Sequence, residues 1–289
     1  MTATALDAEI GPVRQGWRAL LWIGLLTALW IALNYALPII AASGISTVAA
    51  RVSVHVMIAL GLWLGLERTD LTPAQRRNAW LAVMIPFTLW LAFVWGAAIN
   101  GVFRGGVVPV PLTPLAIFLP VIIGVPILLR SRRIGQVLDA MPASWLVALQ
   151  VYRVLGSAFL IGWALGAVPG IFALPAGIGD VITGLLALPA AIAVAAGTID
   201  GRKAAIAWNI FGLLDFTVAI SLGLASSPGP LQLIVPSIPN TTAGIYPTVM
   251  IPAFAVPTSI LLHAVSLRQL YRRARRAATA APVEALALA

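Results

Sequence analysis

The stretch that decides the fold is residues 111–133, PLTPLAIFLPVIIGVPILLRSRR. Its first nineteen residues carry one hydroxyl side chain, Thr113, and three arginines follow within the next four residues. A membrane-spanning helix needs about 20 mostly apolar residues to cross about 30 Å of hydrocarbon. Lys and Arg gather at the cytoplasmic ends of such helices. The stretch therefore predicts a transmembrane helix that ends at a cytoplasmic surface.

The same pattern recurs along the whole chain of 289 residues. The chain is 61% apolar and only 9% charged, too few polar groups to cover a water-soluble fold. We therefore expect an all-α fold, a polytopic transmembrane helical bundle with eight transmembrane helices. The predicted spans are 17–41, 45–66, 78–99, 111–130, 144–167, 176–197, 204–225 and 246–267.

The basic residues predict how the bundle is oriented. With the N-terminus inside, 15 of the 18 Lys and Arg residues fall in cytoplasmic segments. We expect a protein of the inner membrane of a bacterium-like cell with both termini cytoplasmic. The excess of basic residues then indicates contact with anionic lipid headgroups at the cytoplasmic face and not with nucleic acid. The chain has no cysteine, which excludes disulfides and thiolate metal sites.

Short matches between the two halves predict a parallel internal repeat of four helices plus four. GISTV at 44–48 matches GIGDV at 177–181, and the last predicted span of each half carries three prolines. We expect a single integral membrane domain at 1–276, with halves of about 1–133 and 134–276, and a disordered cytoplasmic tail at 277–289. Duplicated halves are common in transporters, whose sites lie between the halves. Chance similarity between Gly-, Ala- and Pro-rich helices is the alternative.

Ionisable residues inside predicted spans are candidate functional residues, because each is costly in hydrocarbon unless it pairs or meets water. Gln150, Arg153 and Ser157 share one face of the fifth span. Asp215 in the seventh span lies at a depth similar to that of Arg153, at a rise of about 1.5 Å per residue. We expect an Arg153–Asp215 pair at the membrane midplane with Asn209 nearby, although such a pair can also serve only to fix helix register.

A second group is predicted nearer the outer side. Arg51 and His55 lie four residues apart on the second span, and Asp180 opens the sixth span after a loose segment. We expect Arg51 to contact Asp180, and the three residues to form an outward gate. The only other histidine, His263, falls near the inner end of the eighth span and is expected to be an interface residue. The long segment between the last two spans either covers the outer mouth or packs on headgroups.

Gly177-Ile178-Gly179-Asp180 resembles the GxGD motif of the intramembrane aspartyl proteases. The resemblance implies a hydrolase acting on peptide or lipid, in which this aspartate and a second one share a proton. It covers four residues. Where that family has an aspartate on the preceding helix, this chain has Tyr152-Arg153, and the remaining candidate, Asp215, follows the motif. No nucleotide-binding or metalloprotease motif is present.

Three functions remain open at this point. The first is a small-molecule or ion permease, or binding protein, with a polar site between the halves. In it Arg153 would face an anion or act as a counter-ion, and Asp215 would exchange a proton. The second is a membrane-embedded enzyme with Asp180 and Asp215 as acid and base, and the third a scaffold subunit. We favour the non-enzymatic permease, with no cofactor and no metal site.

Overall fold

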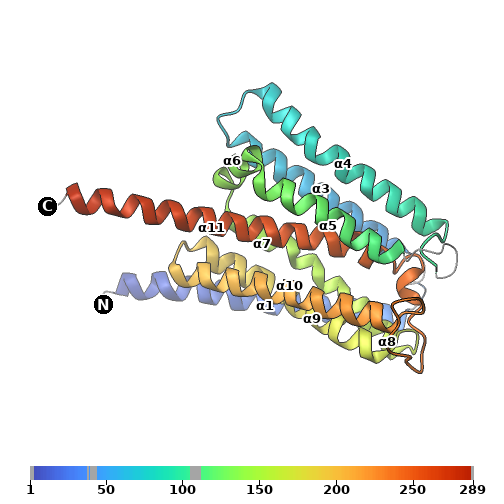
Figure 1. Ribbon diagram of the computed structural model, residues 1–289. Coiled ribbons are helices and arrows are strands. Elements are labelled where there is room, and N and C mark those ends of the chain that lie inside the picture. The colour runs from blue at the N-terminus through green and yellow to red at the C-terminus, as the bar shows by residue number, and fades with distance from the viewer. Residues whose placement is uncertain (1–2, 38, 40–43, 105–111, 288–289) are drawn as a thin grey trace.

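The computed structural model describes residues 3–37, 39, 44–104 and 112–287, and within these ranges the chain is helical with no strand (Figure 1). Eight helical segments are long and apolar enough to cross a membrane, as predicted. The helices are α1 (Ala3–Ala36), α3 (Ile45–Glu67), α4 (Pro73–Ile99), α5 (Leu112–Arg130), α6 (Arg132–Ala140), α7 (Ala143–Leu149), α8 (Ser157–Ala164), α9 (Gly170–Ala195), α10 (Ile199–Ser226) and α11 (Val256–Ala287). Three short turns complete the order: the 3₁₀ helices η1 (Gln150–Gly156) and η2 (Thr242–Gly244), and the π-helix η3 (Ile251–Ala255).

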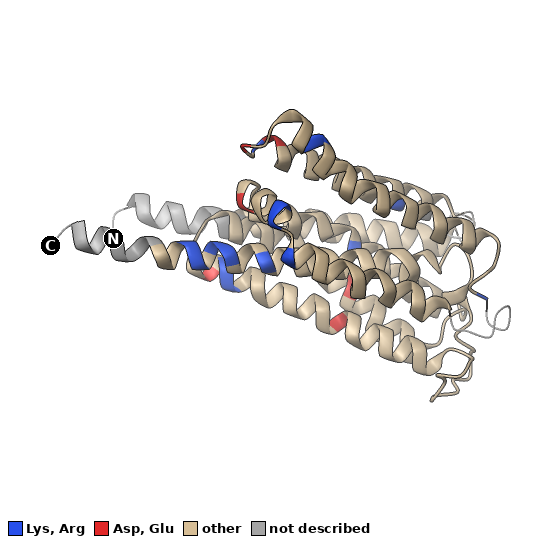
Figure 2. Ribbon diagram, turned by 45° about the horizontal axis from the view of Figure 1, so that its top comes forward, with Lys and Arg blue, Asp and Glu red and all other residues tan. Residues whose placement is uncertain are grey.

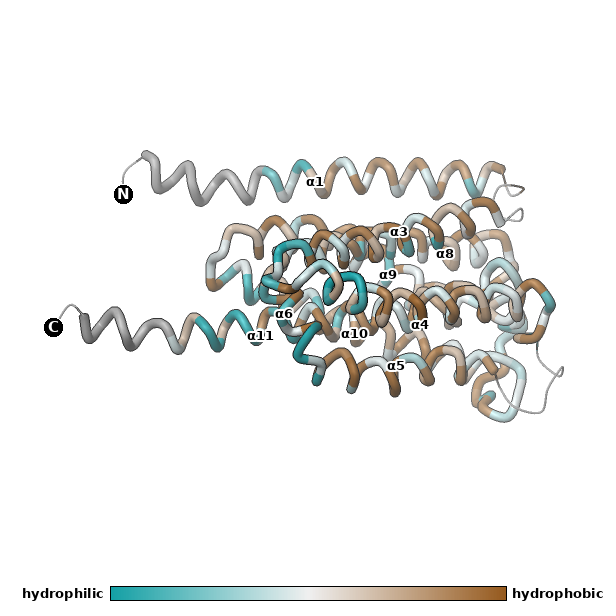
Figure 3. The backbone as a smooth tube through the Cα atoms, turned by 90° about the horizontal axis from the view of Figure 1, so that it is seen from above, coloured by the Kyte–Doolittle hydropathy of each residue, from teal (hydrophilic) through white to brown (hydrophobic). Residues whose placement is uncertain are grey.

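The surface along the bundle is apolar. Large hydrophobic side chains such as Leu25 on α1, Leu60 on α3 and Ile122 on α5 are more than half exposed. Figure 3 shows hydrophobic residues along the helices and hydrophilic ones at α6 and near the end of α11. A soluble monomer rarely exposes so much contiguous apolar surface. Lipid is therefore the natural solvent of these flanks.

Helix α11 is the central helix. It packs against α5 on one side and against α7 and α10 on the other, and its span is the most enclosed of the eight. Helix α1 packs against α8 and α9 instead of against α3 and α4. The two sequence halves are thus interleaved and do not form two separate four-helix bundles. The internal repeat stays a prediction.

Two predicted spans differ from the observed helices. The fifth is not one α-helix, because η1 interrupts it between α7 and α8 over seven residues. The sixth begins at Gly170, so the segment expected to be loose is the first part of α9, and Asp180 lies inside the helix. Pro175 is compatible with this, since a proline near a helix start removes only one early hydrogen bond.

The end of the bundle where α1 begins and α11 ends is basic, and Figure 2 shows Lys and Arg gathered there. There the short helix α6 is held against α11. Arg272 donates to both oxygens of Asp139 at 3.0 and 2.5 Å, and Arg276 donates at 2.7 Å. Partial burial alone would raise the pKa of Asp139, but the hydrogen bond from Arg272 and the charges of Arg272, Arg276 and Arg268 together hold it below its ordinary value.

Candidate functional site: a buried arginine between two carboxylates

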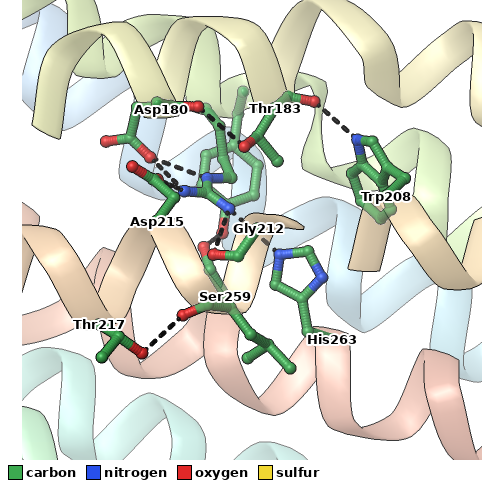
Figure 4. Close-up of polar contacts among 12 residues, drawn as sticks. Asp180, Thr183, Trp208, Gly212, Asp215, Thr217, Ser259 and His263 are labelled. Atoms are coloured by element: carbon green, nitrogen blue, oxygen red, sulfur yellow. Dashed lines mark hydrogen bonds and ion pairs between the residues drawn. The ribbon is translucent and has the colours of Figure 1, made fainter. Parts of the chain in front are cut away.

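Arg153 is the centre of a buried polar cluster and contacts Asp180, Asp215, Gly212 and His263, which Figure 4 shows close together. Its Nε donates to Oδ1 of Asp180 at 2.8 Å, and its Nη2 contacts the same oxygen at 2.7 Å. Nη2 also donates to Oδ2 of Asp215. The Arg153–Asp215 contact predicted from their matching depths is present.

The third nitrogen of the guanidinium faces α10 and α11. Nη1 of Arg153 donates to the carbonyl of Gly212 at 3.3 Å and to Nε2 of His263 at 3.1 Å. The guanidinium also lies 3.9 Å from the ring centre of Phe216, a cation–π contact. A guanidinium has five N–H groups and no acceptor. Each of its three nitrogens therefore meets at least one acceptor, and the side chain is only 1% exposed.

The arginine determines the protonation of His263. Because Arg153 only donates, Nε2 of His263 must accept, and the ring proton of the neutral imidazole then lies on Nδ1. Nδ1 is 2.9 Å from Oδ1 of Asn209, which can accept that proton. The amide nitrogen of Asn209 in turn donates to the hydroxyl of Ser266 at 3.1 Å. Asn209 therefore joins the cluster through His263.

Glycines allow these side chains to approach the neighbouring helices. A Cβ at Gly179 would lie 1.7 Å from Oδ1 of Asp215, and a Cβ at Gly156 would lie 2.3 Å from Oδ2 of Asp180. A Cβ at Gly212 would lie 2.5 Å from Nε2 of His263. Any side chain at these positions would collide with the polar groups, as is common where membrane helices pack closely on small residues.

The predicted contact between Arg51 and Asp180 is wrong. Asp180 pairs with Arg153, because α9 starts earlier than expected and carries Asp180 to the level of η1. Arg51 is buried, and its Nε has no hydrogen-bond partner in the described part of the chain. Its charge still acts on Asp180 through space.

The outward gate expected from Arg51, His55 and Asp180 is therefore not assembled. His55 turns to α4, where its ring stacks on Phe87 at 4.9 Å between centres and its Nε2 lies 3.1 Å from the hydroxyl of Thr88.

Gln150 and Ser157 are fully buried, but neither has a recorded hydrogen bond to the cluster. The 3₁₀ spacing of η1 keeps Gln150 and Arg153, which are three residues apart, on one face, whereas it turns Ser157, four residues after Arg153, away from that face. Both amide atoms of Gln150 and the hydroxyl of Ser157 lack a partner among the described residues.

His263 is the member of the cluster that sequence reasoning missed. It is completely buried and not an interface residue. The span was predicted to end at 267, and residues 268–276 that follow carry five arginines although the helix continues through them. His263 was missed because its contacts with Arg153 and Asn209 depend on how α11 packs against η1 and α10.

The cluster comes from one half of the chain only: η1, α9, α10 and α11 supply its side chains. The cluster does not lie between the two halves, although the sequence predicted a polar site there. The first half contributes a cavity wall instead.

A cavity of about 380 Å³ reaches Asp180. It opens at the end of the bundle opposite the one where α1 begins and α11 ends. Its walls come from α5, α8, α9, α10, η3 and the segment between α10 and η3. Residues 227–231, 240, 241 and 243–245 of that segment line the cavity, so the segment forms part of its wall. Asp180 and the ring of Phe216 lie at its base, and the guanidinium of Arg153 lies over that ring.

The geometry limits the chemistry of the two aspartates. Both contact the same nitrogen of Arg153, so a cation lies between them where an aspartyl protease needs a shared proton and a water. Within this contact set, one positive charge meets two negative ones if both aspartates are ionised. Such a set is suited to taking up a proton or another cation.

Comparison with known proteins places residues 110–271 in a family described only as a domain of unknown function (DUF8737). The match covers more than half of the chain, and the chain belongs to this family. The matched segment contains Arg153, Asp180, Asp215 and His263, whereas Arg51 and His55 lie outside it. No curated protein and no solved structure matches the chain.

Proposed function

We propose that this multi-pass membrane protein is a permease or binding protein for a small molecule, whose site is the cavity above the Arg153 cluster. The observation that carries the proposal is that the cavity reaches Asp180, a carboxylate paired with a fully buried arginine. Concave, mostly apolar cavities with a few polar groups are the usual form of ligand sites. Ionisable groups at membrane depth commonly mark substrate or proton pathways.

A coupling mechanism follows from the charges around Arg153. Asp180 faces the cavity, and Asp215 binds the other side of the same guanidinium nitrogen. A cation or proton reaching Asp180 weakens its hold on Arg153, which can then pair more closely with Asp215. The 3₁₀ turn η1, a common site of hinges in helices, carries Arg153 and gives it a segment that can move.

We propose further that the protein lies in an inner membrane with the end of the bundle where α1 begins and α11 ends on the cytoplasmic side. The cavity then opens at the outer face. The concentration of Lys and Arg at that end supports this orientation. A reporter that matures only in the cytoplasm, fused after residue 276, should become active, and one that matures only outside should not. The reverse result would invert the topology.

A scaffold remains the second candidate, because all three guanidinium nitrogens of Arg153 contact acceptors, as a purely structural cluster would require. The two candidates differ in whether the cavity admits solutes. The chain has no cysteine, so a single introduced thiol can be labelled without background. The variant Ala219→Cys, whose position lines the cavity, should react with a membrane-impermeant maleimide, whereas Ala187→Cys, at a fully buried position, should not.

Transport itself is tested in proteoliposomes containing the full chain and a panel of small solutes. Uptake of at least one solute should fall strongly in both Arg153→Ala and Asp215→Asn. An absence of labelling in Ala219→Cys, together with uptake that ignores the substitutions of Arg153 and Asp215, would eliminate the permease.

A further inference from the structure

The charge at the base of the cavity is negative. Among the described residues that line it, the charged ones are Asp180 and Arg104. Arg104 is exposed, so water screens its charge. Asp180 is largely buried, with 12% of its side chain accessible. The charge that a ligand meets deep in the cavity is therefore negative.

The base offers an acceptor and no donor. Oδ1 of Asp180 is occupied by Arg153, whereas no hydrogen bond to its Oδ2 is recorded within the described ranges. Arg153 itself is 1% exposed, and each of its three nitrogens already contacts an acceptor. An anionic ligand would lack a partner there, contrary to the expectation that Arg153 faces an anion. A ligand group that donates hydrogen bonds finds a charged acceptor.

The walls next to this carboxylate are aromatic. Phe159, Phe172 and Phe216 line the cavity, and the first two meet edge to face with ring centres 4.9 Å apart. Aromatic faces attract cations and bury apolar groups equally well. The ring of Phe216 already makes a cation–π contact, because the guanidinium of Arg153 lies over it.

We propose that the cavity binds a protonated primary amine with an apolar body, with its ammonium group on the carboxylate of Asp180 and its body among the phenylalanines. This inference rests on the proposed function and names its substrate class. The volume of about 380 Å³ falls in the range of small-ligand sites, about 300–1,000 Å³.

The remaining positive charge near Asp180 lies outside the cavity. Arg51 acts on Asp180 through space but makes no recorded contact with it and does not line the cavity. It therefore does not occupy the place of the ammonium. Direct contacts of the ligand are thus with Asp180 and the aromatic rings.

The test uses the purified full-length protein in lipid nanodiscs at neutral pH and three probes with the same phenyl body: 2-phenylethylamine, 2-phenylethanol and 3-phenylpropanoate. Binding is measured by calorimetry. The amine should bind about tenfold more tightly than the alcohol, because a hydrogen bond to a charged pair is stronger than one from a neutral donor. The carboxylate should bind more weakly than both.

Three variants locate the effect. Asp180→Asn should remove the preference for the amine over the alcohol. Asp200→Asn is the matched control and should keep the preference. Asp200 is 91% exposed and lies in the first turn of α10, whereas later residues of that helix line the cavity. Ala219→Phe fills the cavity and should abolish binding of all three probes. If Asp180→Asn does not fold, the probe series on the native protein and Ala219→Phe still decide.

Equal binding of amine and alcohol, preference for the carboxylate, or no binding of any probe would overturn the amine assignment. If the Ala219→Cys variant nevertheless reacts with the impermeant maleimide and solute uptake depends on Arg153, the proposed function survives that failure. If that variant is also unreactive and uptake is absent, both proposals fall together.

Discussion

Replacing Arg153 by methionine should destabilise the protein by about 3–5 kcal/mol, the usual cost of removing one partner from a buried ion pair. Methionine keeps much of the length of the side chain but none of its donors. Asp180 and Asp215 would then lose their shared partner while only 12% and 5% of their side chains can reach water. The Gly212 carbonyl and Nε2 of His263 would lose a donor as well.

The assay is reversible unfolding of the purified protein in mixed micelles with increasing SDS, followed by tryptophan fluorescence. The companion variant combines Arg153→Met with Asp180→Asn and Asp215→Asn, so that no charge is left unpaired. It should recover more than half of the lost stability, because replacing a whole buried charge cluster by neutral groups costs little. A single Arg153→Met variant of native stability, or a triple variant no more stable than the single one, would refute the reasoning.

Two further predictions concern packing and pH. Gly179→Ala should cost about 1–3 kcal/mol, the usual cost of overpacking, since its Cβ would collide with Asp215, whereas Gly61→Ala, with nothing within 4 Å, should be neutral or slightly stabilising in the same unfolding assay. The lowered pKa of Asp139 means that its pair with Arg272 stabilises the fold above the ordinary carboxyl pKa of about 4, and that this contribution is lost as the pH falls through the lower folded value. The stability gap between the native protein and Asp139→Asn should therefore be constant near neutral pH and close in acid; a gap independent of pH would contradict the assignment.

The number of helices followed from the apolar runs of the sequence, because a segment in hydrocarbon must satisfy its backbone hydrogen bonds and an α-helix does so by itself. Each span could be recognised alone, from about 20 apolar residues and the basic residues beside it. Span boundaries were less accurate. The hydropathy of residues 150–156 does not distinguish a 3₁₀ turn from an α-helix, and that of residues 170–176 does not distinguish a helix from a loop.

The Arg153–Asp215 pair was predictable because buried opposite charges at equal depth must find each other or water. The choice of Asp180 as the second partner was not. It depends on where α9 begins, and on glycines that let the carboxylates approach. The place of His263 depended on how α11 packs against η1 and α10.

The sequence by itself thus determined the solvent, the number of helices and one of the contacts, since these depend on local hydropathy and on the cost of an unpaired charge. Only the tertiary structure decided which helices surround Arg153, which carboxylate faces the cavity, and that α11 is the central helix. These features depend on helix rotation, side-chain volume and close approach at glycines. In a lipid-facing sequence almost every surface is equally apolar, so hydropathy carries no record of which helix meets which.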